Sequence, residues 1–366
     1  MRLMLSPWQR LLAIVAGLTA ALAGLLVIPT AATHIWLLLF GIAGAVSLIR
    51  FVTKLDYWAD GLLALLGAIA LVSSLTEVGA SLWLTLVATW LFAWLFIDRM
   101  ANAMASGEAK LPGAGLLVAI VFGATLLLIW EITVRGLAVP QVLLPAPSQI
   151  FTRIVNSPAT LWADFVQTFL KSVLSGYAIG CSAGLVVAIL VDRSPFLKRG
   201  LLPIGNFVSA LPIIGIAPIM VMWFGFDWQS KAAVIVCITF FPMLVNTVAG
   251  LNAAGRMERD IMRTYASTYW QTLWKLRLPA AAPFIFNALK INSTLALIGA
   301  IVAEFFGTPI VGMGFRISSE IGKLNVQMVW AEIAVAAVAG SVFYWVVALI
   351  ERAVTFWHPS VRGGRT

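Results

Sequence analysis

The residues of this sequence that could do chemistry are few and lie far apart from one another. Its two cysteines, Cys181 and Cys237, both fall inside apolar runs, so we expect neither a disulfide nor a metal site. Its two histidines, His34 and His358, have no ligand-like neighbours. The sequence contains no glycine-rich phosphate loop, no paired-histidine motif and no Gly-x-Ser-x-Gly. We therefore predict that the chain is not an enzyme and binds no cofactor itself.

The longest charged segment runs from Glu258 to Pro283, in a chain whose other parts are mostly apolar. Within it, apolar residues recur at every fourth position: Ile261, Tyr265, Tyr269 and Leu273. On one helix these residues would form a single apolar stripe. Leu278-Pro279 predicts the end of that helix, because proline lacks a backbone donor and disfavours helical angles in its predecessor. One interpretation of the segment is an amphipathic helix that lies on lipid headgroups.

The elements around this segment are predicted to span a membrane. Of the 366 residues, 61% are hydrophobic and 11% are charged, which excludes a soluble globular protein and favours an all-α polytopic membrane protein. The length accommodates about ten spans of roughly 20 residues each. The apolar runs that we assign to spans are Leu11–Ile28, Ile35–Ile49, Gly61–Ser74, Ala80–Ile97, Gly115–Val134, Phe165–Val191, Gly200–Phe226, Ala232–Leu251, Pro283–Ala303 and Met328–Ile350.

The distribution of charge predicts the orientation of these spans. The formal charge is +9, but the basic residues lie in short loops between apolar runs, which excludes a nucleic-acid partner. Most of them fall on one side if both termini are cytoplasmic, and this places the Glu258–Pro283 segment in the cytoplasm. The first apolar run is longer than the core of a signal peptide, so we expect a retained helix there.

A small, polar segment from Asp98 to Lys110 predicts a domain boundary. It separates an N-terminal four-helix membrane extension, residues 1–110, from a core of six spans in residues 111–366. Within the core, Gly200–Phe226 contains Pro203, Pro212 and Pro218, which predict a kinked or interrupted span.

The spacing in the charged segment resembles the EAA loop of ABC importer permeases. The matching residues are Asp260, then Ala266 where the family has glycine, then Leu276 and Leu278-Pro279. Further matches occur in the family's order: LLPAPSQIF at 143–151, Trp223-Phe-Gly225, Phe240-Phe-Pro242, and Ala303-Glu304 before a Gly-x-Gly turn at 312–314. From about Gly115 to Trp357 the chain is similar to permeases of the nitrate, sulfonate and taurine group, the binding-protein-dependent transport system inner membrane components.

This resemblance implies a type I ABC importer permease core, with its conserved domain at about 162–352 and a cytoplasmic coupling loop at 256–279. It implies partners in a bacterial inner membrane: two ABC ATPase subunits that bind ATP and magnesium, a second permease copy in a homodimer, and a periplasmic substrate-binding protein. The solute would be a nitrate-, sulfonate- or taurine-like anion or a small nitrogen heterocycle such as a vitamin precursor. The coupling residues that it implies are Asp260, Ile261, Tyr265, Ala266, Tyr269, Leu276, Leu278 and Pro279.

Two further sets of residues are candidates for function. Gly176, Gly180 and Gly184 recur at intervals of four and predict close packing of two helices, within or between permeases. Broken helices at membrane depth are tolerated only where they are buried in protein or line a cavity. The pathway candidates near such breaks are Ser209, Pro212, Pro218, Phe240, Phe241 and Asn246.

Two other classes of function remain open at this point. A secondary transporter would transport without an ATPase and would usually contain internal repeats, which we do not find. A membrane scaffold or sensor would use the N-terminal helices as an interaction surface. The acids closest to membrane depth, Glu131, Glu304 and Glu332, lie near span ends, where loop-anchoring roles are favoured over a proton relay.

Overall fold

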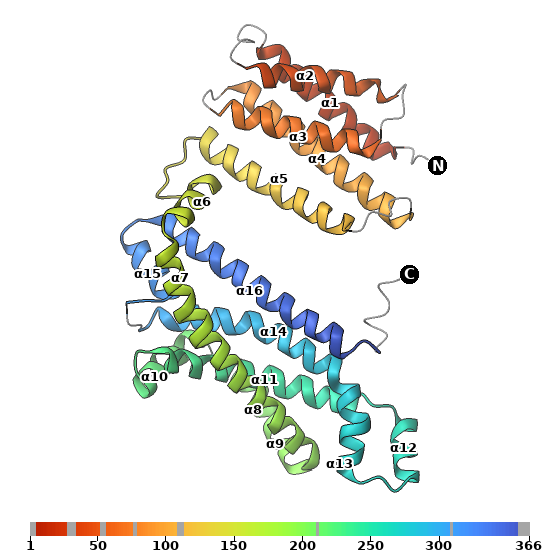
Figure 1. Ribbon diagram of the computed structural model, residues 1–366, viewed down its shortest axis with the longest axis vertical. Coiled ribbons are helices and arrows are strands. Elements are labelled where there is room, and N and C mark those ends of the chain that lie inside the picture. The colour runs from red at the N-terminus through yellow and green to blue at the C-terminus, as the bar shows by residue number, and fades with distance from the viewer. Residues whose placement is uncertain are drawn as a thin grey trace. The chain divides into compact units, whose positions relative to one another are not determined.

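The computed structural model describes residues 5–27, 34–51, 56–75, 79–107, 113–209, 212–307 and 310–357. Every regular element in these ranges is helical, as Figure 1 shows. The chain divides into two compact units, Met1–Gln149 and Ile150–Thr366. The prediction of an all-α polytopic fold is confirmed.

In its described residues the first unit contains five complete helices and a short 3₁₀ turn. They are α1 (Pro7–Val27), α2 (Ile35–Ser47), η2 (Leu48–Phe51), α3 (Tyr57–Ser73), α4 (Ala80–Ala105) and α5 (Ala114–Gly136). Helix α5 packs against α4, with Ala114 buried beside Phe96 and Met100. The compact unit therefore extends to Gln149, past the predicted boundary at residue 110. The assignment of residues 1–110 as a separate extension stays a prediction.

The second unit is built around α11, which packs closely against α8 and α14 (Figure 1). Helix α6 crosses the division between the units. From α6 onward the elements are α6 (Pro147–Asn156), α7 (Pro158–Phe165), the π-helical η3 (Val166–Val173), α8 (Leu174–Arg193), α9 (Pro195–Ser209), α10 (Ile213–Phe224), α11 (Trp228–Asn252), α12 (Arg256–Thr264), α13 (Tyr269–Thr272), the π-helical η4 (Leu273–Arg277), α14 (Leu278–Glu304), α15 (Met313–Gly322) and α16 (Val326–Val354).

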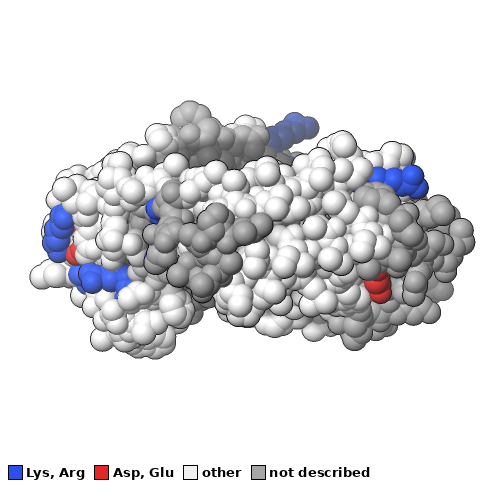
Figure 2. All heavy atoms as spheres, turned by 90° about the horizontal axis from the view of Figure 1, so that it is seen from above, with Lys and Arg blue, Asp and Glu red and all other residues white. Residues whose placement is uncertain are grey.

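Seven helices in the described residues are long and apolar enough to cross a membrane. They are α1, α4, α5, the continuous helix Pro158–Arg193, α11, the continuous helix Tyr269–Glu304, and α16. Three shorter apolar helices, α2, α3 and α10, coincide with the other predicted spans. Charged side chains are sparse on the face that Figure 2 shows, and those visible lie mainly toward its margins.

Prolines shape the connections of the second unit. Helices α6 and α7 begin at Pro147 and Pro158. Proline is tolerated there because the first turn of a helix has unpaired N–H groups in any case. The predicted interruption of Gly200–Phe226 is present, since α9 ends at Ser209 and α10 begins at Ile213.

The three glycines of α8 lie where this helix meets α11. A Cβ atom on Gly176 would lie 2.6 Å from the Cβ of Ile235, and one on Gly184 would lie 2.6 Å from the carbonyl oxygen of Phe240. Gly180 faces Thr239 and the backbone of Val236. Because glycine has no side chain, the two backbones can approach closely at these positions. Such close packing joins membrane helices, since lipid supplies no hydrophobic force between them. The contacts of all three glycines are thus made within one chain.

Candidate functional site

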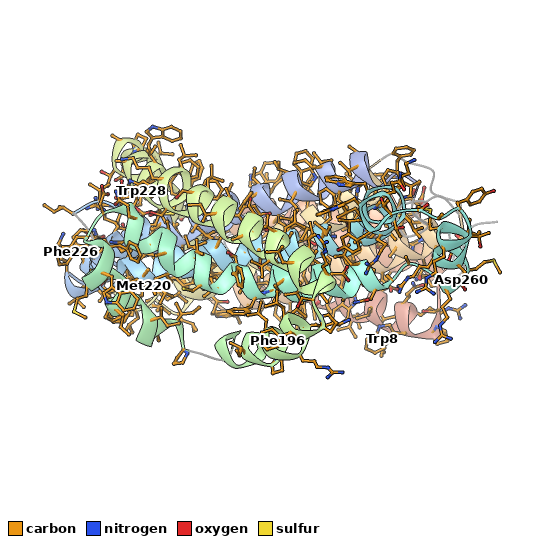
Figure 3. The ribbon with its side chains drawn as sticks, turned by 90° about the horizontal axis from the view of Figure 1, so that it is seen from below. Trp8, Phe196, Met220, Phe226, Trp228 and Asp260 are labelled. Atoms are coloured by element: carbon orange, nitrogen blue, oxygen red, sulfur yellow. The ribbon has the colours of Figure 1, made fainter. Side chains whose placement is uncertain are left out.

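The predicted coupling loop contains a short exposed helix that lies between two long membrane helices. Helix α12 follows the end of α11 and contains no buried residue. Figure 3 shows Asp260, on α12, at one end of the second unit, and Phe226 and Trp228 at the other. Tyr265 and Met257 are 79% and 76% exposed, so large apolar side chains face outward from the loop. This loop presents a surface suited to another protein.

Ala266 forms the corner of the loop in a left-handed conformation. Its φ is 50°, and its N–H donates to the carbonyl of Arg263, 2.9 Å away, as α12 ends. This conformation costs an alanine roughly 1 kcal/mol that a glycine would not lose. The position where the family has glycine is therefore the position that requires positive φ.

The predicted apolar stripe is wrong, because the chain turns between its two halves. A new helix starts at Tyr269, capped by Thr268, whose Oγ1 accepts from the N–H of Gln271 at 3.3 Å. Ile261 lies on α12 and is 50% exposed, whereas Leu273 is fully buried against Leu251 and Ala281. The residues at this fourfold spacing therefore lie on two different elements. Ile261 faces outward on α12, whereas Leu273 packs against the membrane helices.

The predicted end of the helix at Leu278-Pro279 is also wrong. The helix that starts at Tyr269 continues to Glu304, with η4 just before Pro279. The wider π turn of η4 accommodates a residue that cannot donate the regular hydrogen bond. Leu276 and Leu278 are partly buried on this continuous helix. Motion of the loop would therefore reach α14 through an unbroken helix.

A buried ion pair fixes the base of the loop. The Arg277 guanidinium donates to both carboxylate oxygens of Asp192, at 2.7 and 2.6 Å, and its Nε donates to the carbonyl of Leu251 at 2.9 Å. The Tyr269 hydroxyl donates to Asp192 at 3.0 Å. We call Asp192, Tyr269 and Arg277 the clamp. It ties the ends of α8 and α11 to the start of α14.

Sequence reasoning missed the clamp, because its members are 77 and 85 positions apart. The available signal was an aspartate at the end of an apolar span, where an acid without a partner is costly. Arg193 adds to the same corner, with its guanidinium 5.7 Å from the centre of the Tyr269 ring and 5.9 Å from that of Trp270. These cation–π contacts further restrict the loop's base.

The opposite end of the second unit contains a second buried polar site. Glu304 is 2% exposed, and its carboxylate accepts from the Thr168 hydroxyl at 2.8 Å and from the Gly314 N–H at 2.7 Å. A Cβ on Gly312 would lie 2.8 Å from this carboxylate, and its φ of 142° also disfavours other residues. The Ala303-Glu304 and Gly-x-Gly motifs therefore form one structural feature, which holds the loop before α15.

Neighbouring contacts hold α15 and the start of α11 at this end. Arg316 of α15 pairs with the fully buried Asp164 at 2.8 Å. Gln167 donates a hydrogen bond to Asp227 at 3.0 Å, and this bond helps to hold the pKa of Asp227 below its ordinary value. In the first unit, Glu131 accepts from the Ser148 N–H at 2.9 Å. Glu131 and Glu304 thus both anchor loops.

The pathway candidates lie in two places. Pro212 precedes α10 and Pro218 lies inside it, both exposed, while Ser209 ends α9 with its side chain outside the described residues. Phe240 and Phe241 pack edge to face at 4.9 Å, partly buried, on an α11 that continues through Pro242. The Asn246 amide donates to the carbonyl of Pro242 at 2.8 Å, within its own helix. Their role in a pathway stays a prediction.

Much of the second unit is similar in sequence to a known family of membrane proteins. Residues 178–356 match the model of the family described as "Binding-protein-dependent transport system inner membrane component". The formylaminopyrimidine transport permease protein ThiX of Halalkalibacterium halodurans is 30% identical over 236 residues, 64% of this chain and 94% of the relative. The riboflavin transport system permease protein RibX of Chloroflexus aurantiacus is 28% identical over 68% of this chain and 92% of the relative.

The taurine transport system permease protein TauC of Escherichia coli is 26% identical over 65% of this chain and 89% of the relative. These relatives are permease subunits for different solutes, and nearly their whole length is covered by about two thirds of this chain. The chain therefore belongs to the binding-protein-dependent transport system inner membrane components, as an ABC importer permease of the nitrate, sulfonate and taurine group.

Proposed function

We propose that this chain is the membrane-spanning subunit of an ATP-driven importer and forms the pathway for a small solute. A periplasmic binding protein delivers the solute, and two ABC ATPase subunits bind ATP and magnesium. A second copy of the chain completes the pathway as a homodimer. Both termini are cytoplasmic in this proposal, so that the coupling loop lies on the side where ATP is available.

The observation that carries the proposal is the contrast between the two ends of the coupling loop. Its α12 end exposes apolar side chains such as Tyr265, whereas its base is held by the buried pair Asp192–Arg277. A partner that moves α12 would therefore move the ends of α8, α11 and α14 with it, since the clamp connects all three. This is the arrangement that mechanical coupling to an ATPase requires.

The solute class follows from the relatives and from the scarcity of charge within the spans. The names of these relatives include formylaminopyrimidine, riboflavin and taurine. We propose a solute of this size range, either a small anion or a flat nitrogen heterocycle. Ser209, Phe241 and Asn246 are the positions that we propose for its pathway.

A charge on the partner-facing side of the loop tests this function. Ala266→Asp and Leu276→Asp are expected to abolish uptake while the protein remains in the membrane, because an ion buried against a partner costs several kcal/mol, or roughly that order. The measurements are solute uptake and co-purification of the ATPase.

Ala266→Gly is the matched control at the same corner. Glycine adopts positive φ without strain, so this variant is expected to retain the ATPase and normal uptake. If both aspartate variants still bound the ATPase and transported at the normal rate, the assignment of the coupling loop would be wrong.

A further inference from the structure

Glu332 of α16 is a buried acid whose carboxyl group has no hydrogen-bond donor among the described residues. Its side chain is fully buried, and neither of its carboxylate oxygens accepts a hydrogen bond there. An ionised carboxylate is costly in such a place, and most of all on a membrane helix, because no water replaces the missing donors. The carboxyl group of Glu332 therefore requires either a bound cation or a proton.

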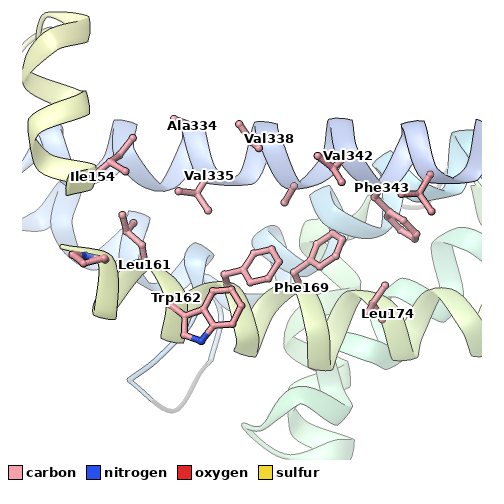
Figure 4. A pocket seen from close by; sticks show the side chains of 14 residues that line it. Ile154, Leu161, Trp162, Phe169, Leu174, Ala334, Val335, Val338, Val342 and Phe343 are labelled. Atoms are coloured by element: carbon pink, nitrogen blue, oxygen red, sulfur yellow. The ribbon is translucent and has the colours of Figure 1, made fainter. Parts of the chain in front are cut away.

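The nearest acid to Glu332 is the buried Asp164 of α7. Figure 4 shows α7 beside α16, where Leu161 and Val335 line the same groove, and each of these two residues lies about one helical turn from one of the acids. The Glu332 carboxyl group lies within hydrogen-bonding distance of that of Asp164. Two carboxyl groups can form a hydrogen bond only when one of them carries a proton.

Asp164 already accepts two hydrogen bonds from the N-terminal end of α15. Its Oδ1 accepts from the Gly312 N–H at 2.6 Å, and its Oδ2 accepts from the Arg316 Nε at 2.8 Å. An ionised carboxylate has about four acceptor positions, so that it can also accept from a protonated Glu332. Because both existing donors stabilise the ionised form of Asp164, the proton belongs on Glu332.

The other charges around this pair supply no further cation. On the neighbouring helices they are Glu304 of α14 and Arg316 and Glu320 of α15. Arg316 already forms an ion pair with Asp164, and Lys231 of α11 acts on Glu304. The part of the chain that the structure describes contains no group of three or more acids, histidines or cysteines that could hold a metal ion. A proton is therefore the charge that this arrangement fits.

We propose that Asp164 and Glu332 share one proton, and that this proton makes the contact between α7, α15 and α16 sensitive to pH. The shared proton joins α7 to α16, while Gly312 and Arg316 join α15 to the same aspartate. Loss of the proton leaves two adjacent carboxylates with one guanidinium, and their repulsion weakens the attachment of α15. The proposal does not depend on which solute the protein transports.

Infrared spectroscopy of the full-length protein in detergent tests for the proton directly. At neutral pH we expect a carbonyl-stretching band of a protonated carboxylic acid that shifts in D₂O and is lost in Glu332→Gln. Glu320→Gln is the matched control and should keep this band, because the Glu320 carboxylate already accepts from Lys323 at 2.8 Å and from Asn325 at 2.6 Å. The same band in Glu332→Gln and wild type would overturn the proposal.

The pH dependence of denaturant unfolding is the second measurement, made on the same preparations. If the native state binds one proton more than the unfolded chain, the unfolding equilibrium constant rises about tenfold per pH unit until the pair ionises. Wild type is therefore expected to lose stability as the pH rises from neutral. In Glu332→Gln the amide can donate to Asp164 in place of the acid, so this slope should be lost with little change at neutral pH.

Glu320→Gln should keep the wild-type slope in the same measurement. Equal slopes in Glu332→Gln and wild type would contradict the shared proton. A bound cation is the other outcome that would overturn the proposal. In that case the sodium or potassium concentration at constant pH would change the stability of wild type but not that of Glu332→Gln.

Discussion

At the scale of single residues, the central feature is the clamp at the base of the coupling loop. The side chains of Arg277 and Asp192 are 13% and 4% exposed, so their ion pair is largely removed from water. A buried pair of this kind adds little net stability, but removal of one member leaves the other charged and unpaired. Substitution of Asp192 or Arg277 alone should therefore destabilise the protein, whereas substitution of both should destabilise it by less than the sum of the two single effects.

Asp192→Asn and Arg277→Gln are each expected to lower the free energy of unfolding by about 3 kcal/mol. The double variant should lose less than the sum, because neither charge is then left without its partner. Thermal unfolding of the purified chain measures this. The pair Arg263–Asp260 on α12 is the control, since its side chains are 83% and 69% exposed and its atoms are 3.7 Å apart. Additive losses at Asp192 and Arg277 would contradict the clamp.

At the scale of elements, the sequence is most informative where a position requires a glycine for one physical reason, either close packing or a positive φ. The glycine spacing of α8 predicts close packing, and the structure places these glycines against α11. Ala266 stands where the family has glycine, and the structure shows that this position has a φ of 50°, which glycine adopts without strain.

The sequence was less informative where distant segments determine local structure. The stripe from Ile261 to Leu273 has a helical period, yet burial of Leu273 against Leu251 favours a separate helix after the turn. Pro279 was expected to end a helix, but η4 accommodates it. The clamp has no local pattern, since its members meet only after α8 and α14 have packed.

Gly180→Leu tests the packing of α8 on α11. Gly180 lies in contact with Thr239 and the Val236 backbone, so a large side chain must separate the two helices. Overpacking of this kind costs about 1–3 kcal/mol, and we expect a lower unfolding temperature and reduced uptake. Gly123→Leu on α5 is the control, because nothing lies within 4 Å of a Cβ atom there. Equal effects of the two variants would refute a specific role for Gly180.

At the scale of the whole molecule, residues 1–110 are the part that the resemblance does not cover. Four spans would return the chain to its starting side, so removal of this segment preserves the orientation of every later helix. A chain that begins near Lys110 is therefore expected to insert correctly and to bind the ATPase. Reporter fusions in the loop at 307–322 measure this orientation, and an inverted core would exclude a separate N-terminal extension.

The central claim is that the chain transports only when an ATPase drives the coupling loop. Uptake of the solute held by the cognate binding protein, measured in proteoliposomes with and without the ATPase subunits, tests this most directly. We predict uptake only when the ATPase is present with ATP and magnesium on the side of α12, and none in its absence. Uptake at the same rate without the ATPase, driven by a proton or sodium gradient, would contradict this claim and identify a secondary transporter.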